Sequence, residues 1–171
     1  PGPHQNFRNR MPLTDEKAVP IVEDVLNNSV NGEIVELLKA GGCDAVSVKG
    51  NSLLKCKKLV PKDDNGADVD IGYVGVIDSV DALEIERILE SGKTPVISPI
   101  AIGGDSHAYN TNADVAAAAV AKALKARRLV FLCDVPGLMR DPKDRSTLIS
   151  HLKVSEVAPL EKSGVIGGGM M

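Results

Sequence analysis

The spacing of apolar residues predicts two amphipathic helices near the start of the chain. In the first helix these residues recur at three- and four-residue intervals: Ala18, Ile21, Val22 and Val25. Thr14 offers a hydroxyl cap before them, and Pro20 is expected to kink this helix or delay its start. The polar run 27–29 interrupts the pattern, so a second helix is expected from Val30 to Gly41.

Further along the chain, short apolar runs alternate with helical patterns. Strands are expected at residues 44–48, 53–60, 69–76, 95–100 and 128–133, and helices at 81–90, from Asn112 to Lys125, and after Ser155. The lysines of 53–60 favour an edge strand. Alternation of helix and buried strand between residues 30 and 133 is typical of an α/β fold with a mainly parallel sheet covered by helices.

A polar stretch directly precedes the Ala-rich helix. Asn110, Asn112 and Asp114 stand at its start, downstream of the buried strand 95–100. A strand, a glycine-containing loop and a helix N-terminus form the arrangement in which α/β proteins bind anions. A simple helix cap would also explain such residues, but the stretch holds more polar groups than one cap needs.

Composition limits the classes of function. The chain has 171 residues, with 43% hydrophobic and 25% charged, as expected of one globular domain. A net charge of −3 with interspersed signs argues against a nucleic-acid partner, and the absence of a long apolar run argues against a membrane span. Three widely spaced cysteines favour a reduced, cytoplasmic protein.

Several kinds of catalytic and metal site find no match in the sequence. The Gly-x-x-x-x-Gly-Lys phosphate loop does not occur. The three histidines form no ligand pair on a helix, so no metal site is expected. Ser98 and Ser106 lack the surroundings of a hydrolase nucleophile.

Four segments together carry a family resemblance. They are Ile97-Ser98-Pro99-Ile100, Tyr109-Asn110-Thr111-Asn112-Ala113-Asp114, Cys133-Asp134-Val135-Pro136-Gly137-Leu138 and Gly164-Val165-Ile166-Gly167-Gly168-Gly169-Met170. In order and spacing the chain from about residue 13 resembles the acetylglutamate kinases of the amino acid kinase family. The resemblance implies a three-layer α/β/α sandwich with a mainly parallel sheet, in one domain over residues 1–171 that is incomplete at both ends.

The resemblance also implies a reaction and its partners. These are ATP-dependent phosphorylation of the γ-carboxylate of N-acetyl-L-glutamate in arginine biosynthesis, with Mg²⁺ carried by the nucleotide, in a cytoplasmic homo-oligomer. Asn110 would hold the α-carboxylate region of the substrate, and Asp114 would act in catalysis by pairing with the catalytic lysines. The nucleotide would be bordered by Asp134, Val135, Gly137, Leu138, Gly168, Gly169 and Met170.

Some positions depart from the family pattern. Both phosphate-facing lysines of the family fall outside the 171 residues, and Pro12 stands where an arginine that grips the substrate is expected. Two alternatives therefore stay open. One is a non-catalytic module that binds ligand or an intact kinase subunit, and the other is a sister phosphotransferase acting on another carboxylate, a carbamate or a nucleoside monophosphate.

Overall fold

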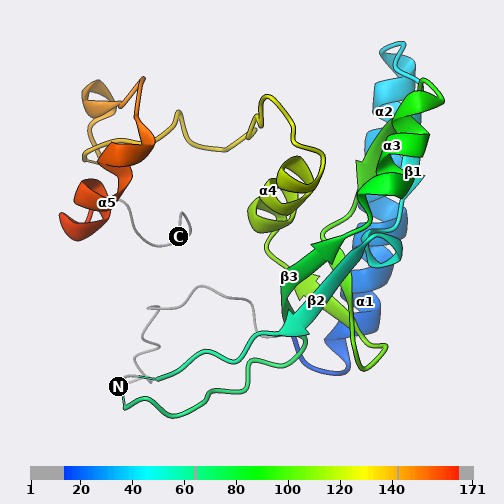
Figure 1. Cartoon of the computed structure of the whole chain (residues 1–171), viewed down its shortest axis with the longest axis horizontal. Helices are drawn as coiled ribbons and strands as arrows, with labels where there is room; N and C mark the ends of the chain where they lie inside the picture. The colour runs from blue at the N-terminus through cyan, green and yellow to red at the C-terminus, as the bar shows by residue number, and fades with distance from the viewer. Residues whose placement is uncertain (1–13, 64, 142, 166–171) are drawn as a thin grey trace. The chain divides into compact units, whose positions relative to one another are not determined.

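The computed structural model describes residues 14–63, 65–141 and 143–165. They divide into two compact units, residues 14–129 and residues 130–165 (Figure 1). The first unit contains all the named strands and the helices α1 to α4, whereas the second contains η3 and α5. The Asn110 and Asp114 positions belong to the 14–129 unit, and the Asp134 to Leu138 positions belong to the 130–165 unit.

The first helical segment runs without a break through the predicted interruption. Helix α1 (Ala18–Asp24) continues as the π-helical segment η1 (Val25–Val30) and then as α2 (Asn31–Ala40). The expected break at 27–29 is therefore wrong. A π segment adds a residue to a turn, so it absorbs the change of apolar spacing while the backbone stays helical. Asn27 and Asn31, each 2% exposed, both turn toward the protein interior.

The start of α1 agrees with the expected effect of Pro20 but not with the expected cap. The helix begins at Ala18, which puts Pro20 in the first turn, where its missing N–H is harmless. A carboxylate oxygen of Asp15 accepts hydrogen bonds from the N–H groups of Lys17 (3.0 Å) and Ala18 (2.8 Å). Thr14 is buried, and its carbonyl accepts a bond of 2.7 Å from the N–H of Tyr73.

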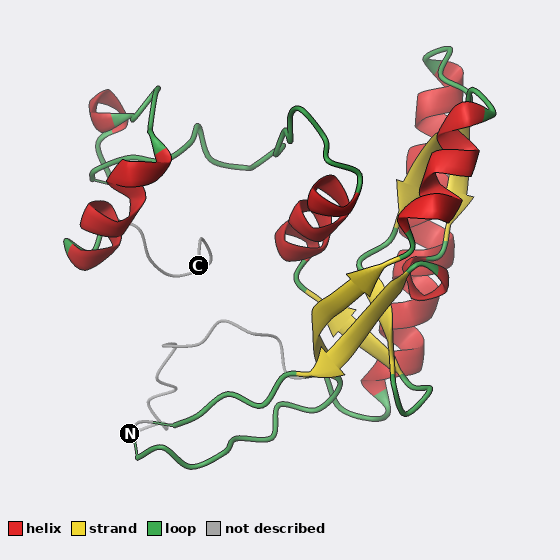
Figure 2. Cartoon of the chain, viewed as in Figure 1, coloured by secondary structure: helices red, strands yellow, loops and turns green. Residues whose placement is uncertain are grey.

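The prediction of an α/β fold with parallel strands is confirmed in the 14–129 unit. Strands β1 (Ala45–Val48) and β4 (Thr94–Ile97) pair in parallel, with Ala45 opposite Thr94. Helix α2 contacts β1, and α3 (Ala82–Glu90) contacts β4 (Figure 2). The side chain of Asp81 caps α3 by accepting a hydrogen bond of 3.1 Å from the N–H of Glu84. The helix expected at 81–90 is therefore present.

The other four strands of this unit form a closed, mixed sheet that the sequence did not predict. Its order is β2 (Leu54–Lys58), β3 (Val74–Val80), β6 (Ala108–Thr111) and β5 (Ile100–Gly103). Hairpins β2–β3 and β5–β6 are antiparallel, and parallel pairs join one hairpin to the other. Strand β2 has a partner on each side, so the expectation of an edge strand is wrong. Its lysines Lys57 and Lys58 instead pair with Asp78 at 2.5 Å and Asp70 at 2.9 Å.

The strand expected at 95–100 is divided between the two sheets. Strand β4 ends at Ile97, and β5 begins at Ile100, so Ser98 and Pro99 carry the chain from one sheet to the other. Proline cannot donate to a strand ladder, which favours the break at this point. The β6 strand was not expected, because its residues were assigned to a loop and to the approach to the next helix.

Buried side chains from the closed sheet and from the helices at 82–90 and 113–123 form the core of the 14–129 unit. The core cluster consists of Leu53, Leu54, Cys56, Ile85, Ala101, Tyr109 and Ala116. Tyr109 and Ala116 belong to β6 and to helix α4 (Ala113–Ala123), respectively. The segment that carries Asn110 and Asp114 is thus anchored at both ends by core residues.

The 130–165 unit is sparsely packed over the residues that the structure describes. It contains a 3₁₀ turn η3 (Arg145–Thr147) and helix α5 (Val154–Lys162), and Leu160 is its one buried residue within the described ranges. The expected strand at 128–133 is wrong, because no described strand pairs with it and Leu132 is 96% exposed. The expected cap Ser155 lies inside α5, and Glu156 instead accepts a bond of 2.7 Å from the N–H of Lys153. No helix within the described ranges has the length and apolarity needed to cross a membrane.

Candidate functional site

Asn110 lies on β6, which pairs with β3 on one side and with β5 on the other. It stands opposite Ile100 of β5 and Val74 of β3. Its N–H donates a hydrogen bond of 2.9 Å to the carbonyl of Tyr73, which fixes the backbone. Its side chain is half-buried, and Nδ2 donates a long bond of 3.5 Å to Oγ1 of Thr14. The amide group of Asn110 is therefore placed by the strand more than by side-chain partners.

The start of helix α4 separates a structural residue from a candidate functional one. The side chain of Asn112 accepts a hydrogen bond of 3.0 Å from the N–H of Val115, so Asn112 is the helix cap. Asp114 lies exposed in the first turn, near the positive end of the helix dipole. Among the described residues its carboxylate makes no ion pair within 4.0 Å. The simple cap reading accounts for Asn112 and leaves Asn110 and Asp114 without a capping role.

Two threonines to which the sequence analysis gave no role at the site support Asn110. Thr111 is buried, and its hydroxyl donates a bond of 2.7 Å to the carbonyl of Pro99. Its spacing of two residues from Tyr109 is the signal that would have found it, because both side chains then share the inner face of a strand. Thr14 was expected to cap a helix, and no local pattern indicated its contact with a residue 96 positions away.

A hairpin turn next to Asn110 holds a charged and aromatic cluster. The phenol of Tyr109 donates a hydrogen bond of 2.7 Å to Asp105, and its ring centre lies 5.5 Å from that of Tyr73. Burial, together with the carboxylate of Asp105, raises the pKa of Tyr109 to about 12. The same bond from Tyr109, followed by the N–H of His107, holds the pKa of Asp105 below its usual range. These bonds fix the turn between β5 and β6.

An apolar groove of about 360 Å³ runs between β4 and α4. Its lining includes Pro95, Ile97, Pro99, Ala113, Ala117 and Val120. Ser98 adds a hydroxyl, but this hydroxyl already accepts a bond of 2.8 Å from the N–H of Gly50. The groove therefore offers shape and apolar surface, and it is poorly equipped to hold a phosphate group.

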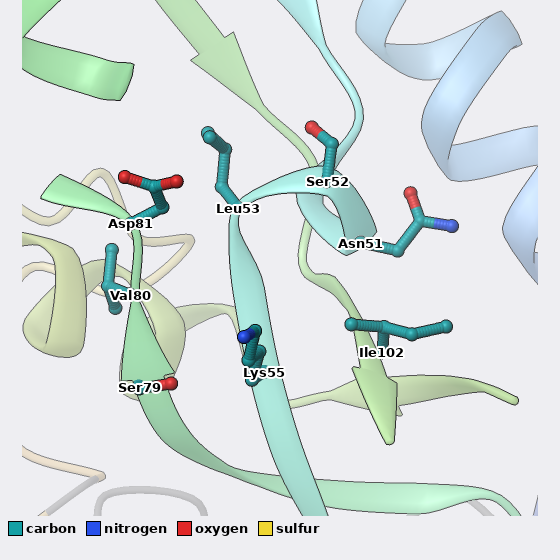
Figure 3. Close-up of a pocket in the computed structure, with 8 residues that line it drawn as sticks. All are labelled: Asn51, Ser52, Leu53, Lys55, Ser79, Val80, Asp81 and Ile102. Carbon is teal, nitrogen blue, oxygen red and sulfur yellow. The ribbon is translucent and has the colours of Figure 1, made fainter. Parts of the chain in front are cut away.

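A second hollow, of about 230 Å³, lies on the outer side of the closed sheet and contains none of the predicted site residues (Figure 3). Lys55 of β2 and Ser79 of β3 stand opposite each other in it. Two of its other polar side chains are already bonded: Asp81 caps α3, and Asn51 donates a bond of 2.7 Å to Glu23. We therefore do not assign the candidate site to this hollow.

The predicted nucleotide-contacting residues belong to the 130–165 unit or lie outside the described residues. Asp134, Val135 and Gly137 are exposed, whereas Leu138 is half-buried, and its carbonyl accepts a bond of 2.8 Å from Ile149. Gly137 has φ of 141°, a conformation that favours glycine. Gly168, Gly169 and Met170 lie outside the described residues.

A metal site of protein ligands is absent from the described ranges. No three His, Cys, Asp or Glu side chains gather there closely enough to hold an ion.

Comparison with known proteins gives the class to which this fold and these residues belong. The family model described as "Amino acid kinase family" matches residues 2–171, and the chain belongs to that family. The chain is 44% identical to an acetylglutamate kinase of Syntrophomonas wolfei over 99% of its own length and 58% of the relative. It is also 44% identical to an acetylglutamate kinase of Clostridium beijerinckii, over 96% of this chain and 57% of that relative. The chain thus spans less than two thirds of these relatives.

Solved structures are similar in fold. A crystal structure from Streptococcus mutans UA159 matches with a TM-score of 0.75 at 24% identity, over 92% of this chain and 61% of that one. The N-acetylglutamate synthase of Neisseria gonorrhoeae, solved with coenzyme A and N-acetyl-glutamate, matches with a TM-score of 0.57 at 25% identity. This second match covers 75% of the chain described here and 28% of the synthase.

Proposed function

We propose that this chain is part of an enzyme that transfers the γ-phosphoryl group of ATP to the γ-carboxylate of N-acetyl-L-glutamate. The observation that carries the proposal is its 44% identity to acetylglutamate kinases over nearly its whole length. Asn110 and Asp114 stand four residues apart, at the end of a core-anchored strand and the start of a helix. This is the kind of location at which α/β proteins bind anionic ligands.

The roles follow from the chemistry of phosphoryl transfer, which needs positioning and charge stabilisation more than covalent help. The Nδ2 group of Asn110 is a hydrogen-bond donor suited to a substrate carboxylate. Asp114, exposed and without an ion pair among the described residues, is free to orient cationic groups around the reacting phosphate. ATP supplies the phosphoryl group and carries the Mg²⁺ that offsets its charge.

Four of the predicted nucleotide-contacting residues lie among the described residues, and their chemical groups suit parts of a nucleotide. Val135 and Leu138 offer apolar side chains to a base, and the carboxylate of Asp134 can accept hydrogen bonds from amino or hydroxyl groups. Gly137, with φ of 141°, allows a close approach of the backbone. Gly168, Gly169 and Met170 would complete this border.

We further propose that the whole protein is one three-layer α/β/α domain that includes residues 1–171. The parallel pair β1–β4, with α2 against β1 and α3 against β4, supports the layers. We propose that it acts in the cytoplasm, where its substrates would be found.

We also propose that it forms a homo-oligomer. Five exposed apolar side chains along α1, η1 and α2 support association with a second copy: Ile21, Val25, Val30, Ile34 and Leu37. The molar mass of the full protein in solution, measured by light scattering, tests the proposed oligomer. A monomer at micromolar concentration would contradict it.

The enzymatic test is release of ADP from MgATP by the full natural chain, with and without N-acetyl-L-glutamate. We expect release that depends on this substrate. A panel containing other carboxylates, a carbamate and a nucleoside monophosphate separates the sister phosphotransferases. Release with one of these and none with N-acetyl-L-glutamate would refute the proposed substrate.

Substitution of Asp114 tests its catalytic role in the same protein. We expect Asp114→Asn to lower turnover by about 10²-fold or more, because a neutral amide cannot orient cations at the phosphate. Nucleotide affinity, measured by calorimetry, should change far less. Turnover near that of the wild type would remove Asp114 from the catalytic machinery.

A further inference from the structure

A buried polar cluster lies where β1 and β4 end, and Ser98 is at its centre. Ser98 is 4% exposed and directly follows β4. Its hydroxyl accepts a hydrogen bond of 2.8 Å from the N–H of Gly50 and donates one to Oδ1 of Asn27. The donor and one acceptor site of the hydroxyl are therefore both used, which fixes the side-chain rotamer.

The backbone around Ser98 is held from more than one side. A side chain on Gly50 would meet the carbonyl oxygens of Ser98 and Ile100, since a Cβ there would lie 2.0 and 2.4 Å from them. The segment after β1 is thus pressed directly against residues 98–100. Nearby, Nδ2 of Asn31 donates a bond of 2.8 Å to the carbonyl of Val96, which ties α2 to β4.

Residues 98–100 also bond to β6, the strand that contains Asn110. The carbonyl of Pro99 accepts two bonds from Thr111, one of 2.7 Å from the hydroxyl and one of 3.1 Å from the N–H. Thr111 directly follows Asn110 in β6, and Ile100 stands opposite Asn110 in the sheet. A continuous path of bonds therefore runs from Asn27 through Ser98 and Pro99 to the backbone of Asn110.

We propose that Ser98 is a positioning residue for Asn110, acting through Pro99 and Thr111. The inference rests on the proposed function, in which Asn110 binds the substrate carboxylate. Among the described residues, the side-chain amide of Asn110 makes one long bond of 3.5 Å, to Thr14, so the direction of the amide depends on the backbone. Ser98, which is 4% exposed, fixes that backbone through its buried bonds and acts on the substrate only through Asn110. A displacement of Asn110 by a fraction of an ångström weakens a directional hydrogen bond to the substrate.

The test is steady-state kinetics on the full natural chain, with N-acetyl-L-glutamate and MgATP varied separately. We expect Ser98→Ala to raise the KM for N-acetyl-L-glutamate about tenfold while the KM for ATP changes less than about twofold. Ser91→Ala is the matched control, because the Ser91 hydroxyl is exposed and, among the described residues, donates its bond to the carbonyl of Ile88 at the end of α3. This control should leave both KM values unchanged.

Three further variants, two at Asn27 and one at Thr111, separate positioning from stability. Asn27→Leu removes the acceptor of the Ser98 hydroxyl while keeping the same branching and number of side-chain heavy atoms, whereas Asn27→Asp keeps an acceptor oxygen. Asn27→Leu should reproduce the KM pattern of Ser98→Ala, and Asn27→Asp should restore most of the substrate affinity. Thr111→Val, which keeps the branched shape and removes the bond to Pro99, should give the same pattern from the other end of the path.

The outcomes are distinct. If the variants lower the melting temperature but leave the KM for N-acetyl-L-glutamate unchanged, Ser98 is only structural and the inference is overturned. A rise of both KM values by the same factor overturns it as well. If the wild-type chain releases no ADP with N-acetyl-L-glutamate, the proposed function itself fails, and Asn110 loses the role on which the positioning of Ser98 depends.

Discussion

The two segments that carry the candidate site residues, 108–114 and 128–138, differ in how they are held. In the first, Tyr109 and Thr111 are buried and Asn110 is bonded on both sides within a closed sheet. In the second, Val130 is 75% exposed, and no described strand pairs with residues 128–138. Both contain apolar residues followed by polar ones. The difference shows that an apolar run becomes a strand only when neighbouring strands complete its hydrogen bonds.

The largest expected effect comes from replacing a leucine of the core by alanine, compared with the same change in the exposed segment. Leu54, 1% exposed, lies in the core, whereas Leu132 lies in the exposed segment. We expect Leu54→Ala to lower the free energy of unfolding by about 3 kcal/mol and Leu132→Ala by less than about 0.5 kcal/mol. Urea denaturation followed by circular dichroism measures both. Equal losses would mean that the 128–138 segment is packed as tightly as the core.

A smaller loss of unfolding free energy is expected at Gly50, which lies directly against the backbone of Ser98 and Ile100. Gly50→Ala should lower the free energy of unfolding by about 2 kcal/mol, because the new Cβ would collide with two backbone carbonyls. Gly104→Ala is the matched control, since no atom lies within 4 Å of its Cβ position. A Gly50 variant as stable as the control would contradict the tight contact between the segments after β1 and β4.

The start of α4 allows a sharper division between structural and functional polar residues. Asn112→Ala should lower the free energy of unfolding by about 1 kcal/mol, because the helix loses the capping bond from the N–H of Val115 to Asn112. Asp114→Asn should cost less than about 0.5 kcal/mol, since only a charge near the helix dipole changes. Thermal unfolding of both variants gives the comparison. A larger loss for Asp114→Asn would make Asp114 the structural residue of the two.

The smallest effect is a pH dependence in the β5–β6 hairpin. The pKa of Tyr109 is raised to about 12, so the stabilisation from its protonated phenol is complete below its unfolded pKa of about 10 and is lost as pH rises toward 12. The chain has two tyrosines, so absorbance near 295 nm can follow their ionisation. We expect Tyr109→Phe to remove a component that titrates near pH 12.

Asp105→Asn completes this test. It keeps the phenol of Tyr109 and removes the negative charge, so the pKa of Tyr109 should fall while burial keeps it above its ordinary value. If the component lost in Tyr109→Phe titrates near pH 10 in the otherwise native protein, the phenol is neither buried nor paired with Asp105.

Local patterns predicted much of the 14–129 unit. The helix at 81–90, the start of the Ala-rich helix at Asn112, the short strand at 44–48, observed as β1, and the delayed start of α1 all follow from caps, periodicity and proline. The break at 27–29 was wrong, because Asn27, a residue type that disfavours helices locally, is held in the helix by a buried bond from Ser98.

For the candidate site, the sequence by itself determined the residue types, their order and the helix start that brings Asn110, Asn112 and Asp114 close together. These depend on neighbours a few positions away. Only the tertiary structure decided that Thr14 and Thr111 support Asn110, and that Ser98, between the two sheets, bonds to Asn27 of η1. Those assignments depend on hydrogen bonds between residues 12 to 96 positions apart, and the energy of such bonds is set by burial that no local pattern encodes.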